Sequence, residues 1–324
     1  MRKGWKEDDL LAHIAKAFRF PGDRRLLLGP GDDCAVLRQT PGARLVITTD
    51  ELVEGTHYLP SFADPEELAR KLLRVNLSDL AGMGAVKPVS CVVAAGLRRD
   101  TPPEFLCRFV SRLRAEALRF GVSVAGGNLA GARENHFAMT VWGEARDGGL
   151  VRRSGARAGD LLLNVGPLGD AAAGLELLKE GKPAELRRYP GLARAFWRPE
   201  PMFAAGAVIA GRGLASALMD NSDGLLRSAL ALADFAGCRA VLSPGAIAPS
   251  RALRAYCAER GRDWRSYALS GGEDYGLVFA ARPGRLRLIK KRLPAAAVVG
   301  RLEKGDGFKV EDYGGKTGRF EHFQ

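Results

Sequence analysis

A short apolar run that ends in oxygen-bearing side chains is the feature that most constrains this chain. Residues Leu45–Ile47 are suited to a buried strand, and they lead directly into Thr48–Asp50. A carboxylate at the end of a buried strand is costly unless a cation or several hydrogen-bond donors meet it. Asp32 and Asp33 stand shortly upstream. The segment therefore predicts several carboxylates that converge on Mg²⁺.

The following segment predicts an amphipathic helix that places another carboxylate in the interior. Asp64 is a good N-cap, Pro65 suits the first helical position and Glu67 completes a capping box. Asp79 falls in the middle of the apolar stripe of this helix. Purely structural carboxylates are rare in such positions. A ligand or catalytic role for Asp79 is favoured, and a satisfied buried carboxylate is the alternative.

Two domains are expected because 324 residues are long for one hydrophobic core. The composition shifts to Gly, Arg and Asp around residues 146–160, so we place one domain at 1–148 and the other at 149–324. The first half has an α+β pattern, with strands predicted at 89–95, 122–125 and 137–142, a turn at 126–128 and a helix from 101 to 121. The second half reads as an α/β layer, with strands predicted at 161–165, 217–219, 240–242, 277–279 and 297–299.

Composition argues against several classes of protein. The five cysteines are scattered and form no C-x-x-C pair, which favours reduced cytosolic thiols over a disulfide framework or a zinc site. No apolar run approaches about 18 residues, and the charged N-terminus lacks the apolar core of a signal peptide, so we expect a cytoplasmic protein without a membrane partner. The formal charge of +12 is spread among acidic residues and accompanies no nucleic-acid motif. An anionic small molecule is the expected partner, and nucleic acid is not.

A second acidic motif lies at 220–224, where a buried strand meets a helix. It reads Asp-Asn-Ser-Asp-Gly. One interpretation is a capping turn in which Ser222 is the N-cap. The other is that Asp220 and Asp223 share Mg²⁺ with the upstream carboxylates. Because the ligand candidates offer only oxygen, with no His or Cys grouping, they favour Mg²⁺ over zinc.

Three further segments carry weaker signals. The loop Gly166–Asp170, between a strand and a helix, could present backbone N–H groups to a phosphate. In Ser270–Tyr275, two glycines permit close approach to a ligand, although a plain turn explains them equally well. His57 is the only histidine within an acidic motif. The sequence has neither a P-loop nor the protein kinase motif set.

Taken together, these segments resemble the thiamine-monophosphate kinases, whose superfamily includes aminoimidazole ribonucleotide synthetase and selenophosphate synthetase. The resemblance runs almost end to end. It is carried by the segments at 31–37, 48–57, 76–85, 153–160, 168–175, 222–225, 268–275 and 320–323.

The resemblance implies a fold, a reaction and an assembly. The fold is the two-domain one of aminoimidazole ribonucleotide synthetase, with an N-terminal α+β domain for ATP, Mg²⁺ and dimerisation and a C-terminal α/β domain. The reaction is ATP-dependent phosphorylation of thiamine monophosphate to thiamine diphosphate, in thiamine diphosphate biosynthesis. Transfer is direct and in line, assisted by several Mg²⁺ ions, with no catalytic side chain beyond positioning. The assembly is a homodimer whose N-terminal sheets join into a barrel.

The resemblance also implies site residues, position by position. The implied Mg²⁺ ligands are Asp33, Thr48, Thr49, Asp50, Asp79, Asn128, Asp220 and Asp223. The implied ATP contacts are Gly127, Asn128, Arg153 and Ser222. The implied thiamine-site residues are His57, Glu273 and Phe320.

Three positions depart from the family pattern. Asn128 stands where the family has an Mg²⁺-binding aspartate, Met202 where it usually has arginine, and Asn221 where it usually has an apolar residue. An alternative is therefore a weakly active or inactive paralogue that binds nucleotide or thiamine phosphate. A further alternative is a related phosphate-handling enzyme with another acceptor, against which His57, Glu273 and Phe320 argue because they match the thiamine-site positions.

Overall fold

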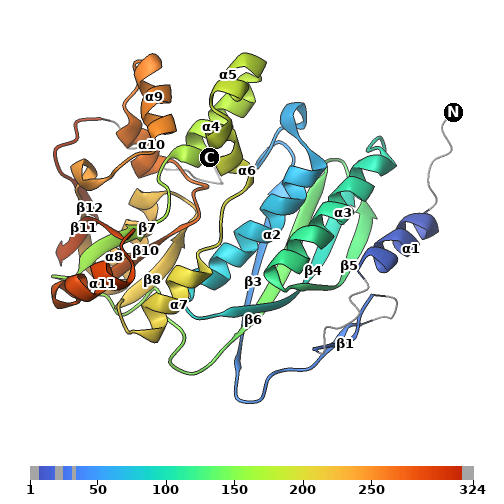
Figure 1. The fold of residues 1–324 in the computed structure, drawn as a ribbon, viewed down its shortest axis with the longest axis horizontal. Coiled ribbons are helices and arrows are strands. Elements are labelled where there is room, and N and C mark those ends of the chain that lie inside the picture. The colour runs from blue at the N-terminus through green and yellow to red at the C-terminus, as the bar shows by residue number, and fades with distance from the viewer. Residues whose placement is uncertain (1–6, 19–24, 31–33, 316–324) are drawn as a thin grey trace. The chain divides into compact units, whose positions relative to one another are not determined.

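The computed structural model describes residues 7–18, 25–30 and 34–315 (Figure 1). The chain divides into two compact units. The first consists of Met1–Leu80 and Lys87–Arg146, and the second of Ala81–Val86 and Asp147–Gln324. The second unit thus includes a short segment from the first half of the sequence, which no shift in composition marks.

The first unit is built on a four-stranded sheet with the strand order β3-β6-β4-β5. Pairing is antiparallel except between β4 and β5, which are parallel and are connected through α3. In Figure 1, α2 and α3 lie side by side over one face of this sheet. The elements are α1 (Glu7–Ala17), β1 (Leu26–Leu28), β2 (Val36–Leu37), β3 (Arg44–Val53), η1 (Pro60–Phe62), α2 (Pro65–Gly82), β4 (Lys87–Leu97), α3 (Pro103–Phe120), β5 (Ser123–Gly131) and β6 (His136–Ala145).

The ends of α2 and α3 follow from local chemistry. The carboxylate of Asp64 accepts the backbone N–H groups of Glu66 at 2.8 Å and Glu67 at 3.1 Å, which confirms the predicted N-cap. Gly121 ends α3 in the left-handed conformation, as expected. The N-cap position of α3 is Pro102 rather than Thr101, where the predicted helix began, and the Thr101 hydroxyl donates to Asn135 Oδ1.

The core of the first unit lies between the sheet and the two helices. Phe137, Met139 and Val141 alternate along β6 on this side and are fully buried. The Phe109 ring of α3 stacks on Phe137 with 4.3 Å between the centroids. Most of α2 is buried on all sides, and its Arg74 is paired with Glu116 of α3.

Two expectations for this sheet are wrong. The strand β3 does not end at Asp50 but continues to Val53, and the side chains of Leu45 and Ile47 are 50% and 59% exposed. They are exposed because β3 is an edge strand and they point to the sheet face opposite the helices. The predicted turn at Gly126–Asn128 is instead the middle of β5, which pairs with β4 over this stretch.

The second unit is built on a six-stranded sheet with the order β12-β9-β11-β7-β10-β8. Only β12 and β9 pair in parallel, so the alternation of strands and helices does not produce a parallel sheet. The strands are β7 (Leu161–Val165), β8 (Ala217–Asn221), β9 (Cys238–Leu242), β10 (Gly276–Ala281), β11 (Ala297–Lys304) and β12 (Phe308–Val310). The helices are α4 (Asp170–Glu180), α5 (Pro183–Arg188), α6 (Pro190–Trp197), α7 (Phe203–Gly211), α8 (Leu225–Ala236), η2 (Pro244–Ala246), α9 (Arg251–Glu259), α10 (Trp264–Ser270), η3 (Pro283–Arg285) and α11 (Leu286–Arg292).

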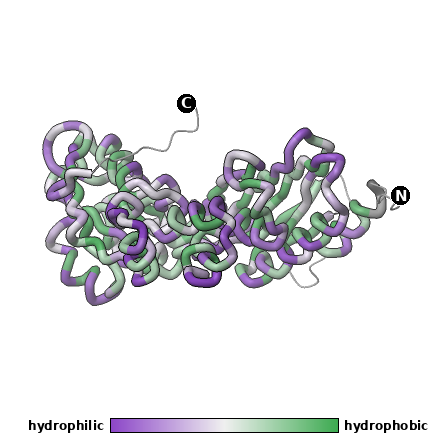
Figure 2. Tube along the Cα trace, turned by 90° about the horizontal axis from the view of Figure 1, so that it is seen from above, coloured by the Kyte–Doolittle hydropathy of each residue, from purple (hydrophilic) through white to green (hydrophobic). Residues whose placement is uncertain are grey.

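Apolar clusters cover both faces of this second sheet. Met219 of β8 packs into the cluster on one face, whereas its neighbour Leu218 packs into the cluster on the other. In Figure 2, many of the outer turns of the chain are hydrophilic, and hydrophobic stretches run between them. All five predicted strands of this half are present. None of the helices in the described ranges is both long and apolar enough to cross a membrane.

Candidate active site

Strand β3 and helix α2 bring together side chains that offer only oxygen. The Thr48 hydroxyl donates a hydrogen bond of 2.6 Å to the Asp79 carboxylate. Asp79 is partly exposed, although Ser78 and Leu80 on either side of it are fully buried. Asp50 shares a face of β3 with Thr48 because successive side chains of a strand alternate. Two carboxylates and a hydroxyl on one side of the sheet are hard oxygen donors of the kind that suits Mg²⁺.

Thr49 and Asn128 lie on the opposite face. The Thr49 hydroxyl donates to the Met139 carbonyl at 3.0 Å and points away from Thr48. Asn128 is exposed and pairs with Ala94 of β4. Through Ala138 of β6, Ala94 is in register with Glu51 of β3, and Glu51 shares a face of the sheet with Thr49. Three strand spacings, about 14 Å, separate this position from β3. Within one chain, Asn128 is therefore remote from Asp50.

The described residues bring together one part of the predicted site. Asp33 and Phe320 lie outside the described residues. Over residues 7–18, 25–30 and 34–315, no three His, Cys, Asp or Glu side chains converge as a metal cluster. The Thr48–Asp79 pair is the part of the expected Mg²⁺ site that the described residues bring together.

His57 lies in a tight turn that follows β3. Its Nδ1 accepts the backbone N–H of Val53 at 3.0 Å, so in the neutral ring the proton is on Nε2. The turn is attached to the rest of the unit by Asn135, whose carbonyl accepts the Tyr58 hydroxyl at 2.9 Å and the Glu54 N–H at 3.0 Å. The role of Asn135 could not be predicted from the sequence, because its partners come from distant segments.

In the second unit, the loop before β10 packs directly on the turn after β8. The backbone N–H of Glu273 donates to the Ser222 carbonyl at 2.6 Å. A Cβ on Gly272 would lie 2.7 Å from that same carbonyl oxygen, and one on Gly224 would lie 2.9 Å from the Gly271 carbonyl. The glycines therefore serve close packing of backbone on backbone. This contact places Ser222 and Glu273, which were predicted for different substrates, side by side.

The carboxylate of Asp274 occupies the start of α4. Asp274 is 3% exposed, and its two oxygens accept the N–H groups of Gly169 at 2.6 Å and Ala171 at 3.2 Å. The hypothesis that this loop offers its N–H groups to a substrate phosphate is wrong for these two groups, since an internal carboxylate already holds them. Burial raises the pKa of Asp274 to about 8, against the lowering effect of the two hydrogen bonds.

The acidic motif at 220–224 is divided between strand and turn. Asp220 is 2% exposed and belongs to β8, whereas Asp223 is partly exposed and pairs with Arg227 at 3.1 Å. The N-cap position of α8 is Gly224, so the prediction of Ser222 as N-cap is wrong. A Cβ on Gly82, in the short segment that joins the second unit, would lie 2.8 Å from the Asp220 nitrogen.

Arg153 is exposed and lies along the edge of β8. Its neighbour Arg152 accepts the backbone N–H of Leu218 at 3.0 Å, and Ser222 follows four residues later. Four residues of extended chain span about 13 Å. Arg153 thus lies near β8 but is not placed beside Ser222, which follows that strand.

The buried side-chain amide of Asn221 has an Nδ2 group without a hydrogen-bond partner among the described residues. Replacement of this residue is therefore expected to change the free energy of unfolding. The side chain is fully buried, its Oδ1 accepts the Ser228 hydroxyl at 3.0 Å, and its Nδ2 has no hydrogen-bond partner among the described residues. Asn221→Val is expected to stabilise the protein by about 1 kcal/mol, because the desolvated amide is removed. Thermal unfolding would then shift upward by about 2–4 °C.

Ser228→Ala is the control for Asn221→Val, because it removes the hydroxyl partner but keeps the amide. It is expected to lower the unfolding temperature. An unfolding temperature of Asn221→Val below that of the wild type would show that the amide is satisfied in solution.

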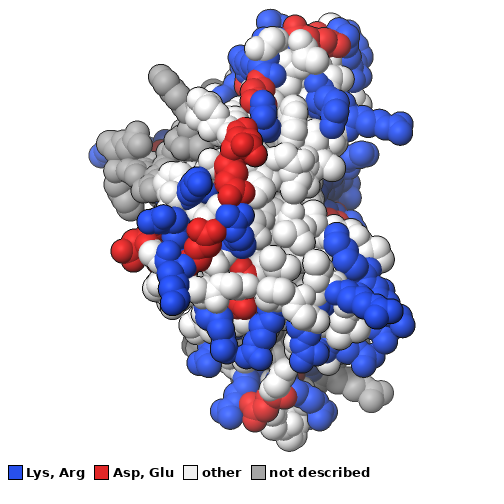
Figure 3. All heavy atoms as spheres, turned by 90° about the vertical axis from the view of Figure 1, so that its left-hand side faces the viewer, with Lys and Arg blue, Asp and Glu red and all other residues white. Residues whose placement is uncertain are grey.

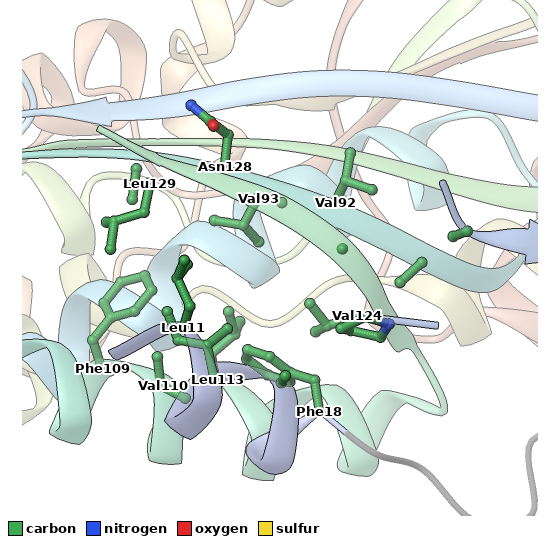
Figure 4. A pocket seen from close by; sticks show the side chains of 18 of the residues that line it. Leu11, Phe18, Val92, Val93, Phe109, Val110, Leu113, Val124, Asn128 and Leu129 are labelled. Atoms are coloured by element: carbon green, nitrogen blue, oxygen red, sulfur yellow. The ribbon is translucent and has the colours of Figure 1, made fainter. Parts of the chain in front are cut away.

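An apolar cavity of about 590 Å³ lies between α1, α3 and the β4–β5 side of the first sheet (Figure 4). In Figure 4, Leu129 and Val93 point toward Phe109 and Leu11, whereas Asn128 points away from them. The volume is within the range of small-molecule sites. Gly127 and Asn128, both predicted to contact ATP, are among its lining residues.

The charged surface is mixed. Figure 3 shows one side of the molecule on which Lys and Arg side chains predominate, with Asp and Glu among them and a broad uncharged area between the basic groups. This matches the dispersed basic residues of the sequence.

Comparison with known proteins identifies the family. Residues 31–145 match the model of the AIR synthase related protein, N-terminal domain. The thiamine-monophosphate kinase of Mycobacterium tuberculosis (strain CDC 1551 / Oshkosh) is 37% identical over 254 residues, which cover 78% of this chain and 74% of that protein. The chain belongs to the thiamine-monophosphate kinase family.

Other members of the thiamine-monophosphate kinase family match over a greater length. The enzyme of Aquifex aeolicus (strain VF5) is 32% identical over 297 residues, 90% of this chain and 92% of its own. A solved structure described as "AaThiL complexed with AMPPCP and TMP" superposes with a TM-score of 0.77 at 30% identity, covering 98% of this chain and 97% of that one. The mixed α/β fold is therefore that of the thiamine-monophosphate kinases.

Proposed function

We propose that this protein transfers the γ-phosphoryl group of ATP to the phosphate of thiamine monophosphate, giving thiamine diphosphate and ADP. The observation that carries the proposal is the hydrogen bond from Thr48 to Asp79, which joins two separate family motifs into one oxygen-rich group. Family membership supports it, as does a relative's structure described as a complex with AMPPCP, an ATP analogue, and TMP.

The chain's contribution is positioning and charge. Two anionic phosphates must approach in line, and bound Mg²⁺ would neutralise their charge. The residues proposed to hold it are Asp33, Thr48, Thr49, Asp50, Asp79, Asn128, Asp220 and Asp223. Gly127, Asn128, Arg153 and Ser222 would contact ATP, and His57, Glu273 and Phe320 would contact thiamine monophosphate. His57 would donate from Nε2, because Nδ1 already accepts the Val53 N–H.

A homodimer would complete this arrangement. The first sheet has two edge strands, β3 and β5, and exposes Leu45 and Ile47. Two such sheets that close into a barrel leave no free edge and place β3 of one copy beside β5 of the other. The partner subunit's Asn128 would then share a sheet face with Thr49 across the new strand pair, whereas within one chain about 14 Å separates Asn128 from β3. We also propose a cytoplasmic location, since all five cysteines are free.

The test of the function is transfer of label from γ-labelled ATP to a panel of acceptors. Thiamine monophosphate, unphosphorylated thiamine and other phosphate monoesters are each offered to the purified full-length protein with Mg²⁺. Label is expected in thiamine diphosphate and in no other product. Label in another phosphorylated acceptor would favour a different enzyme of the same superfamily, and label released only as inorganic phosphate would contradict the proposal.

Asn128 favours a second candidate, a paralogue that binds these ligands without efficient turnover. A neutral amide offers an oxygen but lacks the charge of the family's aspartate. Asn128→Asp is therefore expected to lower the Mg²⁺ concentration for half-maximal rate by about fivefold, from about 1 kcal/mol of added attraction. The measurement is a Mg²⁺ titration of thiamine diphosphate formation.

Asn128→Gln is the matched control because it remains neutral, and it should not lower the Mg²⁺ requirement. An inactive wild type that becomes active as Asn128→Asp would establish the binding paralogue. An unchanged requirement would show that Asn128 is compensated elsewhere or does not meet the metal.

A further inference from the structure

The segment Glu273–Tyr275 has an unusual backbone. Glu273 has φ 71° and Tyr275 has φ 51°, so both non-glycine residues are in the left-handed region that side chains disfavour. Asp312 is the one other such residue in the described ranges. Such conformations persist only where the surroundings hold them, and they cluster at functional sites. Asp274 lies between the two strained residues.

Two sets of hydrogen bonds hold this segment. The backbone N–H groups of Glu273 and Tyr275 donate to the carbonyls of Ser222, at 2.6 Å, and Asn221, at 3.0 Å. The side chain of Asp274 makes the second set of hydrogen bonds. Its carboxylate accepts the backbone N–H groups of Gly169 and Ala171 at the start of α4. The segment is thus attached on one side to the turn after β8 and on the other side to α4.

The start of α4 is a rigid attachment point. A Cβ on Gly169 would lie 2.8 Å from the backbone of Ala268, so this turn is closely packed on α10. Asp170 accepts the hydroxyl of Ser250, the residue that also caps α9. A carboxylate at the N-terminus of an eleven-residue helix is favoured by the helix dipole. The charged groups that face Asp274 are Asp170 of α4 and the neighbouring Glu273, and both raise its pKa.

We propose that Asp274 is a positioning residue that fixes Glu273 for the thiamine end of the substrate, by anchoring the strained loop to the N-terminus of α4. The inference rests on the proposed function, in which Glu273 contacts thiamine monophosphate. Asp274 itself is buried against backbone N–H groups and so is not a contact residue. Without its carboxylate, the left-handed conformation of Glu273 loses one of its two supports.

The substitution that tests this is Asp274→Asn. It keeps the shape, but its amide group would face a backbone N–H where a carboxylate oxygen now accepts one. The apparent KM for thiamine monophosphate is expected to rise at least tenfold. The KM for ATP should change less than twofold, because Ser222 follows directly on β8, whose pairing with β10 does not involve the Asp274 side chain.

The matched control is Asp160→Asn. Asp160 is also a buried carboxylate with two donors, the Ser216 hydroxyl at 2.6 Å and the Arg157 N–H at 3.2 Å. It precedes β7, whereas the loop to α4 follows that strand. Its loss should lower the unfolding temperature and leave both KM values unchanged. An equal rise in the KM for thiamine monophosphate in both variants would overturn the proposal in favour of a general structural effect.

A double-mutant cycle with Glu273→Gln separates positioning from other effects. If Asp274 acts through Glu273, then Asp274→Asn should raise the KM less than twofold further in the Glu273→Gln background. Full additivity of the two effects would contradict the proposal.

Hydrogen exchange of the wild type and Asp274→Asn gives a readout independent of activity. Faster exchange at residues 168–172 and 270–276 is expected, and unchanged exchange would overturn the anchor. A wild type that makes no thiamine diphosphate but shows the same exchange difference would instead contradict the proposed function and leave the anchor established.

Discussion

Asp79→Asn is expected to reduce the rate of thiamine diphosphate formation by about 100- to 1,000-fold at saturating substrates and Mg²⁺. The change removes one negative charge from the group that Thr48 and Asp79 form, and it keeps an oxygen that can accept the Thr48 hydroxyl. The fold should therefore be preserved, with an unfolding temperature close to that of the wild type. The measurement is the initial rate of product formation, with thermal unfolding in parallel.

Asp234→Asn is the matched control for Asp79→Asn. Asp234 is an exposed carboxylate on α8, so the same chemical change there should leave the rate within twofold of the wild type. If Asp79→Asn retained more than about a tenth of the activity, the carboxylate would be a satisfied structural residue. A large loss accompanied by unfolding would not count in favour of the metal role.

Ile47→Lys is expected to convert a dimer into monomers and to reduce the activity by about 100-fold. The side chain is 59% exposed on edge strand β3, two residues from the exposed Leu45, and a charge at this apolar position opposes its burial against a second sheet. The activity would fall because the partner subunit's Asn128 is no longer brought next to strand β3. The measurements are the molar mass in solution and the rate of the same preparation.

The control for Ile47→Lys is Phe235→Lys, because Phe235 is 61% exposed on α8 of the second unit. This variant should keep both the mass and the activity of the wild type. A monomeric wild type with full activity would contradict the proposed assembly, and so would an Ile47→Lys dimer with unchanged rate.

Local chemistry made part of the fold predictable. The cap at Asp64 and the end of α3 at Gly121 depend on neighbouring residues only, and both are confirmed. The exposure of Ile47 was not predictable in this way. An apolar residue in a strand predicts burial, but the sequence does not say whether that burial is against a helix of the same chain or against a second copy.

Site residues whose positions depend on nearby sequence were predictable, and those whose positions depend on contacts with distant segments were not. The apolar stripe of α2 pointed to Asp79, and its pairing with Thr48 followed once β3 and α2 packed together. The bonds of Asp274 to Gly169 and Ala171 cross more than 100 residues, so the sequence alone showed a glycine-rich loop and a free carboxylate. In the fold, the N–H groups of that loop donate to the carboxylate of Asp274.

Incubation of the purified wild-type protein with ATP and thiamine monophosphate across a Mg²⁺ titration is the direct test of the proposed phosphoryl transfer. Thiamine diphosphate and ADP are expected in equal amounts, with a rate that rises with Mg²⁺ to concentrations above those needed to saturate ATP. No thiamine diphosphate at any Mg²⁺ concentration, from protein that still binds nucleotide, would contradict the kinase and establish the binding paralogue.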